Sequence, residues 1–180
     1  MWFAIAAAWG LAEATLFFIV PDVLLTWLAG FRPRLVSRAV AACLGGALLG
    51  GLLMYLAAAD SPQRMRALLA LVPAINADFI AATGAALQEQ YGSQMLRAGF
   101  SGVPYKILAV ESAAQGQSLA MFLGWSVPAR LSRWVLIVLL ARGATLFVRS
   151  RFAAADRVLW ALWGVGWSIV YVVYFTLMGW

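Results

Sequence analysis

The sequence predicts an all-α integral membrane protein with two re-entrant helical hairpins that face each other, about three transmembrane helices and interfacial amphipathic helices. Of the 180 residues, 64% are hydrophobic and only 11% are charged, whereas a soluble domain has about 25% charged residues. Several apolar runs approach the roughly 20 residues that cross a bilayer. Two of these runs are interrupted by a proline close to charged residues. We expect residues 1–180 to form a single membrane domain.

The first interrupted run covers residues 4–30. It contains two carboxylates, Glu13 and Asp22, and Pro21 lies between them. A carboxylate near the bilayer centre costs roughly 2.5–3.5 kcal/mol, so an ordinary anchor helix avoids it. Pro21 also removes one backbone N–H and biases Val20 away from helical dihedrals. We predict a re-entrant hairpin that lines a polar cavity; a single kinked helix with Asp22 as its cap is the alternative.

Two segments of different polarity follow the first hairpin. Residues 36–59 are apolar and predict a transmembrane helix. Gly46 and Gly50 share one face of it, a spacing that lets two membrane helices approach closely, and a homo-oligomer would use this face. Residues 62–98 carry a charge or an amide every few positions, which predicts interfacial amphipathic helices. We expect breaks at Pro73 and at Gly84 or Gly92.

The second interrupted run covers residues 99–125. Gly102 and Pro104 predict its break, and Lys106 and Glu111 supply its charges. We therefore predict a second re-entrant hairpin that returns before Pro128, followed by transmembrane helices over 130–148 and 157–178. Two broken segments at corresponding points of a chain indicate a transport site near the bilayer midplane.

The charges inside these runs need partners, because an unpaired charge in the membrane is costly. Lys106 and Glu111 lie five positions apart, roughly 140° around a helix, and so do not face each other. We expect Lys106 to pair with Glu13 or Asp22 of the other hairpin. Asp22 lies just after the break, where a helix N-terminus favours the anion, so Glu13 is expected to take up a proton more readily.

The candidate site residues form two groups. The expected transport or proton-relay residues are Glu13, Asp22, Lys106 and Glu111. The expected head-group-binding residues are Lys106, Arg130 and Arg133, whose charges suit phosphate. Simpler roles remain open: Arg130 and Arg133 as interfacial anchors, and Glu111 as a structural partner of Arg142.

Composition also excludes several classes. The chain has no histidine and one cysteine, Cys43, so we expect no intramolecular disulfide, no metal site and no cofactor. No serine or cysteine lies in a recognisable nucleophile setting, and we expect no enzyme. The net charge of +6 arises from arginines at junctions between apolar runs, which indicates contact with lipid head groups and not with nucleic acid.

The distribution of basic residues predicts the orientation of the chain in the membrane. The junctions around residues 32–38 and 149–157 hold six basic residues on one side of the predicted topology. Five basic residues are assigned to the other side: Arg64, Arg66, Arg97, Arg130 and Arg133. Since cytoplasmic loops carry an excess of Lys and Arg, we place the first group in the cytoplasm and the C-terminus outside.

Three sequence pieces together resemble the DedA family, also called the VTT or SNARE-associated family. They are AEA…FIVPD over 12–22, the glycine-rich LGGALLGG over 44–51, and FSGVPYK over 100–106, which is similar to a short branch with a P-[FY]-K second hairpin. The resemblance implies facing re-entrant hairpins with essential acids at Glu13 and Asp22 and a basic residue at Lys106. The family's G-R-F-x-P-G-x-R pattern is absent, and its Gly-Asp pair appears as Gly50-Gly51.

The resemblance implies a proton-coupled flippase or scramblase of phospholipid or polyprenyl phosphate. Its partners would be membrane lipids and protons, and its location a bacterial inner membrane. Two alternatives stay open. One is a secondary transporter of a small ion or solute, and the other is a non-transporting membrane scaffold or assembly factor.

Overall fold

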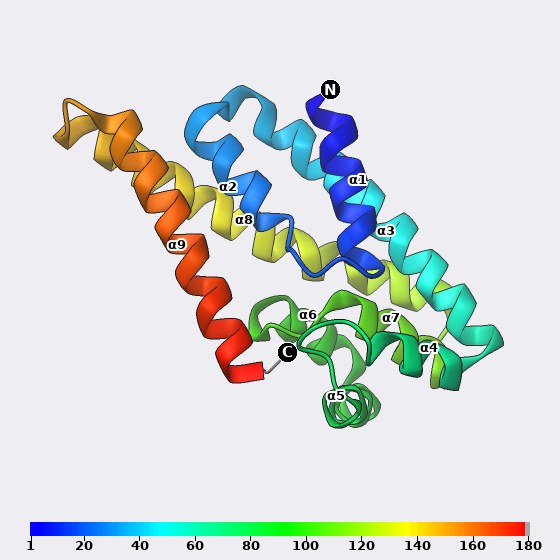
Figure 1. Cartoon of the computed structure of the whole chain (residues 1–180). Coiled ribbons are helices and arrows are strands. Elements are labelled where there is room, and N and C mark those ends of the chain that lie inside the picture. The colour runs from blue at the N-terminus through cyan, green and yellow to red at the C-terminus, as the bar shows by residue number, and fades with distance from the viewer. Residues whose placement is uncertain (179–180) are drawn as a thin grey trace.

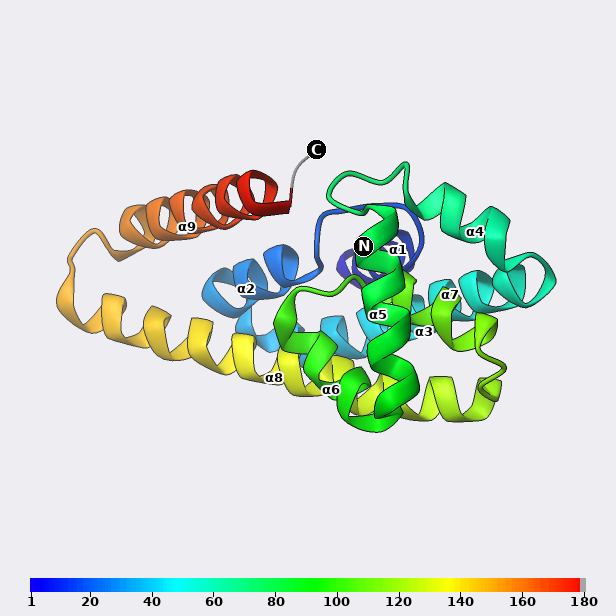
Figure 2. The same ribbon diagram turned by 90° about the horizontal axis from the view of Figure 1, so that it is seen from below.

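The computed structural model describes residues 1–178, and all regular secondary structure in that range is helical. Three of the described helices are long and apolar enough to cross a membrane: α3 (Val36–Asp60), α8 (Leu119–Arg151) and α9 (Ala155–Met178). Helices α3 and α9 run from the end of the molecule near the N-terminus toward the opposite end, and α8 runs in the reverse direction between them in sequence (Figures 1 and 2). The prediction of an all-helical chain with about three helices that could cross a membrane is confirmed.

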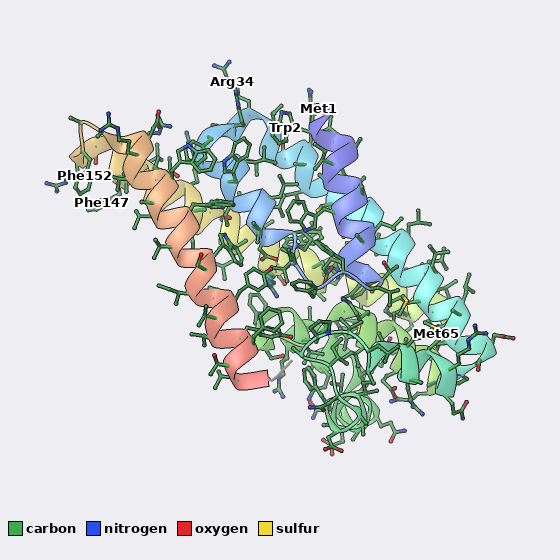
Figure 3. The ribbon with its side chains drawn as sticks, viewed as in Figure 1. Met1, Trp2, Arg34, Met65, Phe147 and Phe152 are labelled. Atoms are coloured by element: carbon green, nitrogen blue, oxygen red, sulfur yellow. The ribbon has the colours of Figure 1, made fainter. Side chains whose placement is uncertain are left out.

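The N-terminal segment reverses direction between two short helices, α1 (Trp2–Ala14) and α2 (Asp22–Phe31). Pro21 is the residue immediately before α2, and the chain returns toward the end where Met1 and Arg34 lie (Figure 3). The non-helical residues between the helices have hydrogen-bond partners. The Ile19 carbonyl accepts from the Trp9 indole N–H at 2.9 Å, and the Val20 N–H donates to the Tyr171 hydroxyl at 3.0 Å. These bonds reduce the cost of a broken backbone in an apolar environment.

Helix α1 packs closely against α3, which follows a short 3-10 helix, η1 (Pro33–Leu35). A Cβ atom at Gly46 would overlap the Ala7 carbonyl oxygen, and one at Gly50 would lie 2.8 Å from the Ala14 Cβ. The glycines therefore allow close contact between α1 and α3, as small residues do between membrane helices. The expectation that the Gly46/Gly50 face serves a second copy of the chain is wrong, because α1 already occupies that face.

We predict that Gly46→Ala strongly destabilises the protein, whereas Gly45→Ala does not. The added methyl group at position 46 must push α1 away from α3, and overpacking of this kind costs about 1–3 kcal/mol or more. At Gly45 an added Cβ meets no atom within 4 Å. The difference in melting temperature between the two variants is measured by thermal unfolding in detergent, with tryptophan fluorescence as the signal. Equal melting temperatures of the two variants would contradict the packing described here.

Three shorter helices connect α3 to the second break: α4 (Pro62–Leu69), α5 (Ala77–Glu89) and α6 (Tyr91–Ser101). The break expected at Pro73 lies between α4 and α5. Gly84 lies inside α5, and the next break falls at Gln90, two residues before Gly92. Asn76 caps α5 by accepting a hydrogen bond from the Phe79 N–H at 2.8 Å.

The second predicted hairpin differs from the structure in its final limb. The break at Gly102 and Pro104 is present: Gly102 ends α6 with φ 81°, and Pro104 precedes α7 (Tyr105–Ala114). However, α8 is continuous through Pro128, so the boundary predicted between residues 125 and 130 is wrong. Proline removes only one helical hydrogen bond, and membrane helices tolerate that loss where neighbouring helices pack against them. Arg130 consequently lies within a helix and not at its end.

The basic residues are distributed more unequally than the sequence suggested. Arg130 and Arg133 pair with carboxylates inside the protein and so do not mark a membrane face. Six arginines lie at or near the connections between α2 and α3 and between α8 and α9. We call this part of the molecule the basic end, and its arginines are Arg32, Arg34, Arg38, Arg149, Arg151 and Arg157. The basic end then has six basic residues, whereas the other side has three, Arg64, Arg66 and Arg97. This excess favours a cytoplasmic basic end.

We therefore predict that the N-terminus and the α8–α9 connection are cytoplasmic and that the C-terminus is outside. Helix α9 starts at the basic end and extends to the opposite end of the molecule (Figure 1). An alkaline phosphatase fused to the C-terminus should be active, because it folds only outside the cytoplasm, and a fluorescent protein fused at the same point should be dark. The reverse pair of signals would overturn this orientation.

Candidate functional site

The breaks before α2 and before α7 lie against each other in the middle of the molecule. The Lys106 ammonium, in the first turn of α7, donates to the Phe17 carbonyl at 2.7 Å. Arg133 of α8 donates to the Gly99 carbonyl of α6 at 3.1 Å and also contacts the first residue of α2. The three hydrogen bonds join residues that are 89, 111 and 34 positions apart in the sequence. The two breaks thus form one polar centre.

Two ion pairs hold this centre together. Arg130 Nη2 lies 2.7 Å from Glu13 Oε2, and both side chains are nearly buried. Arg133 Nε lies 2.9 Å from Asp22 Oδ1, and only the arginine of this pair is partly exposed. The expectation that Lys106 pairs directly with Glu13 or Asp22 is wrong, because the two arginines of α8 take those places. A guanidinium suits this role since it offers several donors in a fixed plane.

Aromatic rings surround Arg130. Its guanidinium carbon lies 4.0 Å from the centre of the Tyr105 ring and 5.2 Å from that of Trp134. The Tyr105 hydroxyl donates to Ser126 at 2.9 Å, and Gly51 leaves room for the ring, since a Cβ there would lie 2.5 Å from that hydroxyl. The Arg130 Nε is buried without a hydrogen-bond partner in the part of the chain that the structure describes. Cation–π contacts therefore supplement the ion pair with Glu13.

Lys106 has a different environment from the two arginines. It is the only lysine in the chain, only 2% of its surface is exposed, and its hydrogen bond goes to a neutral carbonyl. It also lies at the N-terminus of α7, where the helix dipole disfavours a cation and favours an anion. The centre contains three cations, Lys106, Arg130 and Arg133, and two carboxylates, Glu13 and Asp22. One positive charge is therefore in excess, and a monovalent anion would balance it.

A cavity of about 420 Å³ opens beside this charge. Lys106, Arg133 and Glu13 contribute to its lining, together with the hydroxyl-bearing Tyr171 and Tyr174 of α9. Most of the remaining lining is apolar and comes from α8, α9 and the segments next to the two breaks. The cavity thus combines a small charged region with a larger apolar wall. A molecule with an anionic head and an apolar body matches both parts.

Glu111 lies outside this centre. It accepts two hydrogen bonds from the Arg66 guanidinium of α4, each 2.7 Å long, and these bonds raise the pKa of Arg66 above its ordinary value. The expected pairing of Glu111 with Arg142 is wrong: Arg142 makes a long contact of 3.5 Å with the Ala29 carbonyl. Residues 105–114 form one helix, so Lys106 and Glu111 face different neighbours, as their spacing predicts.

The sequence did not identify the contribution of α9 to this centre. Trp163 and Trp167 donate to the Val23 carbonyl and the Thr26 hydroxyl at 3.1 and 3.0 Å, and Tyr171 binds Val20 one turn later. The spacing of Trp160, Trp163 and Trp167 places them on one face and predicts lipid or helix packing, but it does not identify α2 as the partner. Among residues 1–178, no three His, Cys, Asp or Glu side chains gather to hold a metal ion.

No protein-family model, curated protein or solved structure matches this chain. The class is therefore defined by the fold and the site together: a helical membrane protein with three candidate membrane-spanning helices and a buried cluster of charges.

Proposed function

We propose that the protein is a membrane transporter of the DedA type that moves lipid head groups, as a flippase or scramblase of phospholipid or polyprenyl phosphate, in a bacterial inner membrane. In this proposal the segment α1–α2 is re-entrant, and a second re-entrant segment opposite it ends where α8 begins. The observation that carries the proposal is the single excess positive charge, at Lys106, beside a cavity whose other walls are mostly apolar.

The charge balance favours a phosphate ligand. A phosphodiester carries one negative charge and would bind the Lys106 ammonium and the N-terminal N–H groups of α7. Arg133 lines the same cavity and is partly exposed, so it is a second donor for the head group. The apolar wall formed by α8 and α9 would contact the first part of the lipid tail.

Protons provide a means of coupling in this proposal. While no ligand is bound, Glu13 is ion-paired with Arg130 and Asp22 is ion-paired with Arg133. Protonation of Glu13 would remove its attraction for Arg130 and increase the positive charge available to a phosphate. Return of the proton would restore the ion pair and release the head group. Glu111 has no part in this exchange, because its partner is Arg66.

The structure gives less support to the two alternatives. A scaffold would use the Gly46/Gly50 face or the tryptophans of α9, but both pack against helices of the same chain. A small ion or solute would not need the extended apolar wall of the cavity.

Translocation of fluorescent lipids in liposomes tests the proposed function. Vesicles with the purified protein should expose head-group-labelled lipids of both leaflets to an external quencher, whereas protein-free vesicles should expose only the outer leaflet. Acidification should change the rate if protons are coupled to transport. Flux of a small solute without lipid movement would favour the solute transporter, and the absence of both would favour the scaffold.

A further inference from the structure

A second site lies on the other side of α7, in a groove of about 560 Å³ between α4, α5 and α7. Its side walls are mostly alanine, and its polar side chains are Arg66, Gln88, Glu111 and Gln115. Glu111 lies five residues after Lys106, about 7.5 Å along the helix axis and roughly 140° around it. The groove shares no lining residue with the cavity beside Lys106.

Two polar groups in this groove lack partners among the residues that the structure describes. Arg66 uses Nε and Nη2 to bind Glu111, and no hydrogen bond is formed by its other terminal nitrogen, Nη1. Gln115 donates from Nε2 to the Gly84 carbonyl at 2.7 Å, while its Oε1 is buried without a donor. A buried carbonyl oxygen without a donor costs about 1–3 kcal/mol. The groove therefore offers one free donor and one free acceptor.

We propose that this groove binds a zwitterion with a primary ammonium beside a phosphate, the head group of an aminophospholipid. The ammonium would donate to Gln115 Oε1 near the Glu111 carboxylate, and the phosphate would accept from Arg66. Arg66 and Glu111 neutralise each other, so a ligand without net charge adds no uncompensated charge. An anion without an ammonium would be repelled by the nearby Glu111 carboxylate, and a cation without a phosphate would be repelled by the Arg66 guanidinium.

The position of the groove suits a lipid. Helix α4 follows directly after the end of α3, the first candidate membrane-spanning helix, and so lies close to a membrane surface. Arg66 is 42% exposed and accessible from outside the groove, whereas Glu111 and the Gln115 oxygen lie deeper. Gly84 keeps α5 close to the base of the groove, since a Cβ there would lie 2.6 Å from Glu111 Oε2. Either a membrane lipid or soluble phosphoethanolamine could supply this head group.

Native mass spectrometry of the purified full-length protein tests the proposal through binding alone. Protein mixed with equal amounts of phosphatidylethanolamine and phosphatidylglycerol should retain the ethanolamine lipid preferentially. Gln115→Leu should weaken that retention about 10-fold, because the ammonium loses a charge-assisted hydrogen bond. Ala81→Leu, which narrows the wall and leaves the polar groups intact, should do the same. Arg64→Ala, on the same helix as Arg66 but outside the groove, is the matched control.

The outcomes separate the sources of the ligand. Competition by soluble phosphoethanolamine at similar concentration would support the same chemistry from a soluble source. Equal retention of the two lipids, or unchanged retention in both Gln115→Leu and Ala81→Leu, would overturn the proposal. In the Lys106→Met variant the other cavity has lost its cation, so a preference for phosphatidylethanolamine that disappears with Gln115→Leu in that variant comes from the groove, whether or not the transport proposal holds.

Discussion

Replacement of Lys106 by methionine should reduce lipid translocation about 10- to 100-fold while the protein remains folded. The loss corresponds to one charge-assisted hydrogen bond to the head group, about 1.5–3 kcal/mol. Methionine has a similar length, and removal of a buried cation that binds only the Phe17 carbonyl does not leave another charge unpaired. The measurement is the rate of lipid flipping in liposomes, with melting temperature and yield recorded for each variant.

The single lysine provides an independent check of this prediction. An amine-reactive reagent can modify only Lys106 and the N-terminal amine of this chain. Lipid phosphate should protect Lys106 from the reagent, whereas a neutral diacylglycerol should not. Normal flipping by Lys106→Met, or equal protection by both lipids, would show that Lys106 does not bind the head group. The matched control is Arg142→Met. It also removes one positive charge, but Arg142 is on α8 and does not line the cavity.

Replacement of Arg130 by methionine should destabilise the protein by about 3–5 kcal/mol, because Glu13 would then be a buried carboxylate without a cation. The double variant Glu13→Leu with Arg130→Met should recover much of this loss, since both charges are absent. Unfolding in detergent with increasing denaturant measures the four members of the cycle. Additive effects of the two substitutions would contradict the pairing of Glu13 with Arg130.

The exposed pair between Arg149 and Asp156 is the control for this experiment. Its nitrogen–oxygen distance, 2.8 Å, is close to that of the buried pair, but its side chains are 46% and 71% exposed, compared with 10% and 9% for Arg130 and Glu13. Exposed pairs contribute about 0–1 kcal/mol. Arg149→Met should therefore change stability little. A large effect would indicate that burial does not explain the importance of Arg130.

The sequence by itself determined the class of the protein and the positions of its backbone breaks. The scarcity of charges identified a membrane protein, and Pro21, Gly102 and Pro104 located two helix boundaries, because proline and glycine act on the local backbone. The spacing of Lys106 and Glu111 also showed that they face different neighbours. These properties depend on a few adjacent residues and can be derived without knowledge of the fold.

Only the tertiary structure decided which charges meet. Arg130 and Arg133 approach Glu13 and Asp22 because α8 continues through Pro128, and packing rather than local preference maintains that helix. The Gly46/Gly50 face packs against α1 and not against a second copy. The glycine spacing in the sequence shows that a helix can approach closely, but it does not specify which helix. Likewise, Tyr171 reaches Val20 across 151 positions. Pairing over such separations depends on how whole helices pack, and no local sequence pattern encodes it.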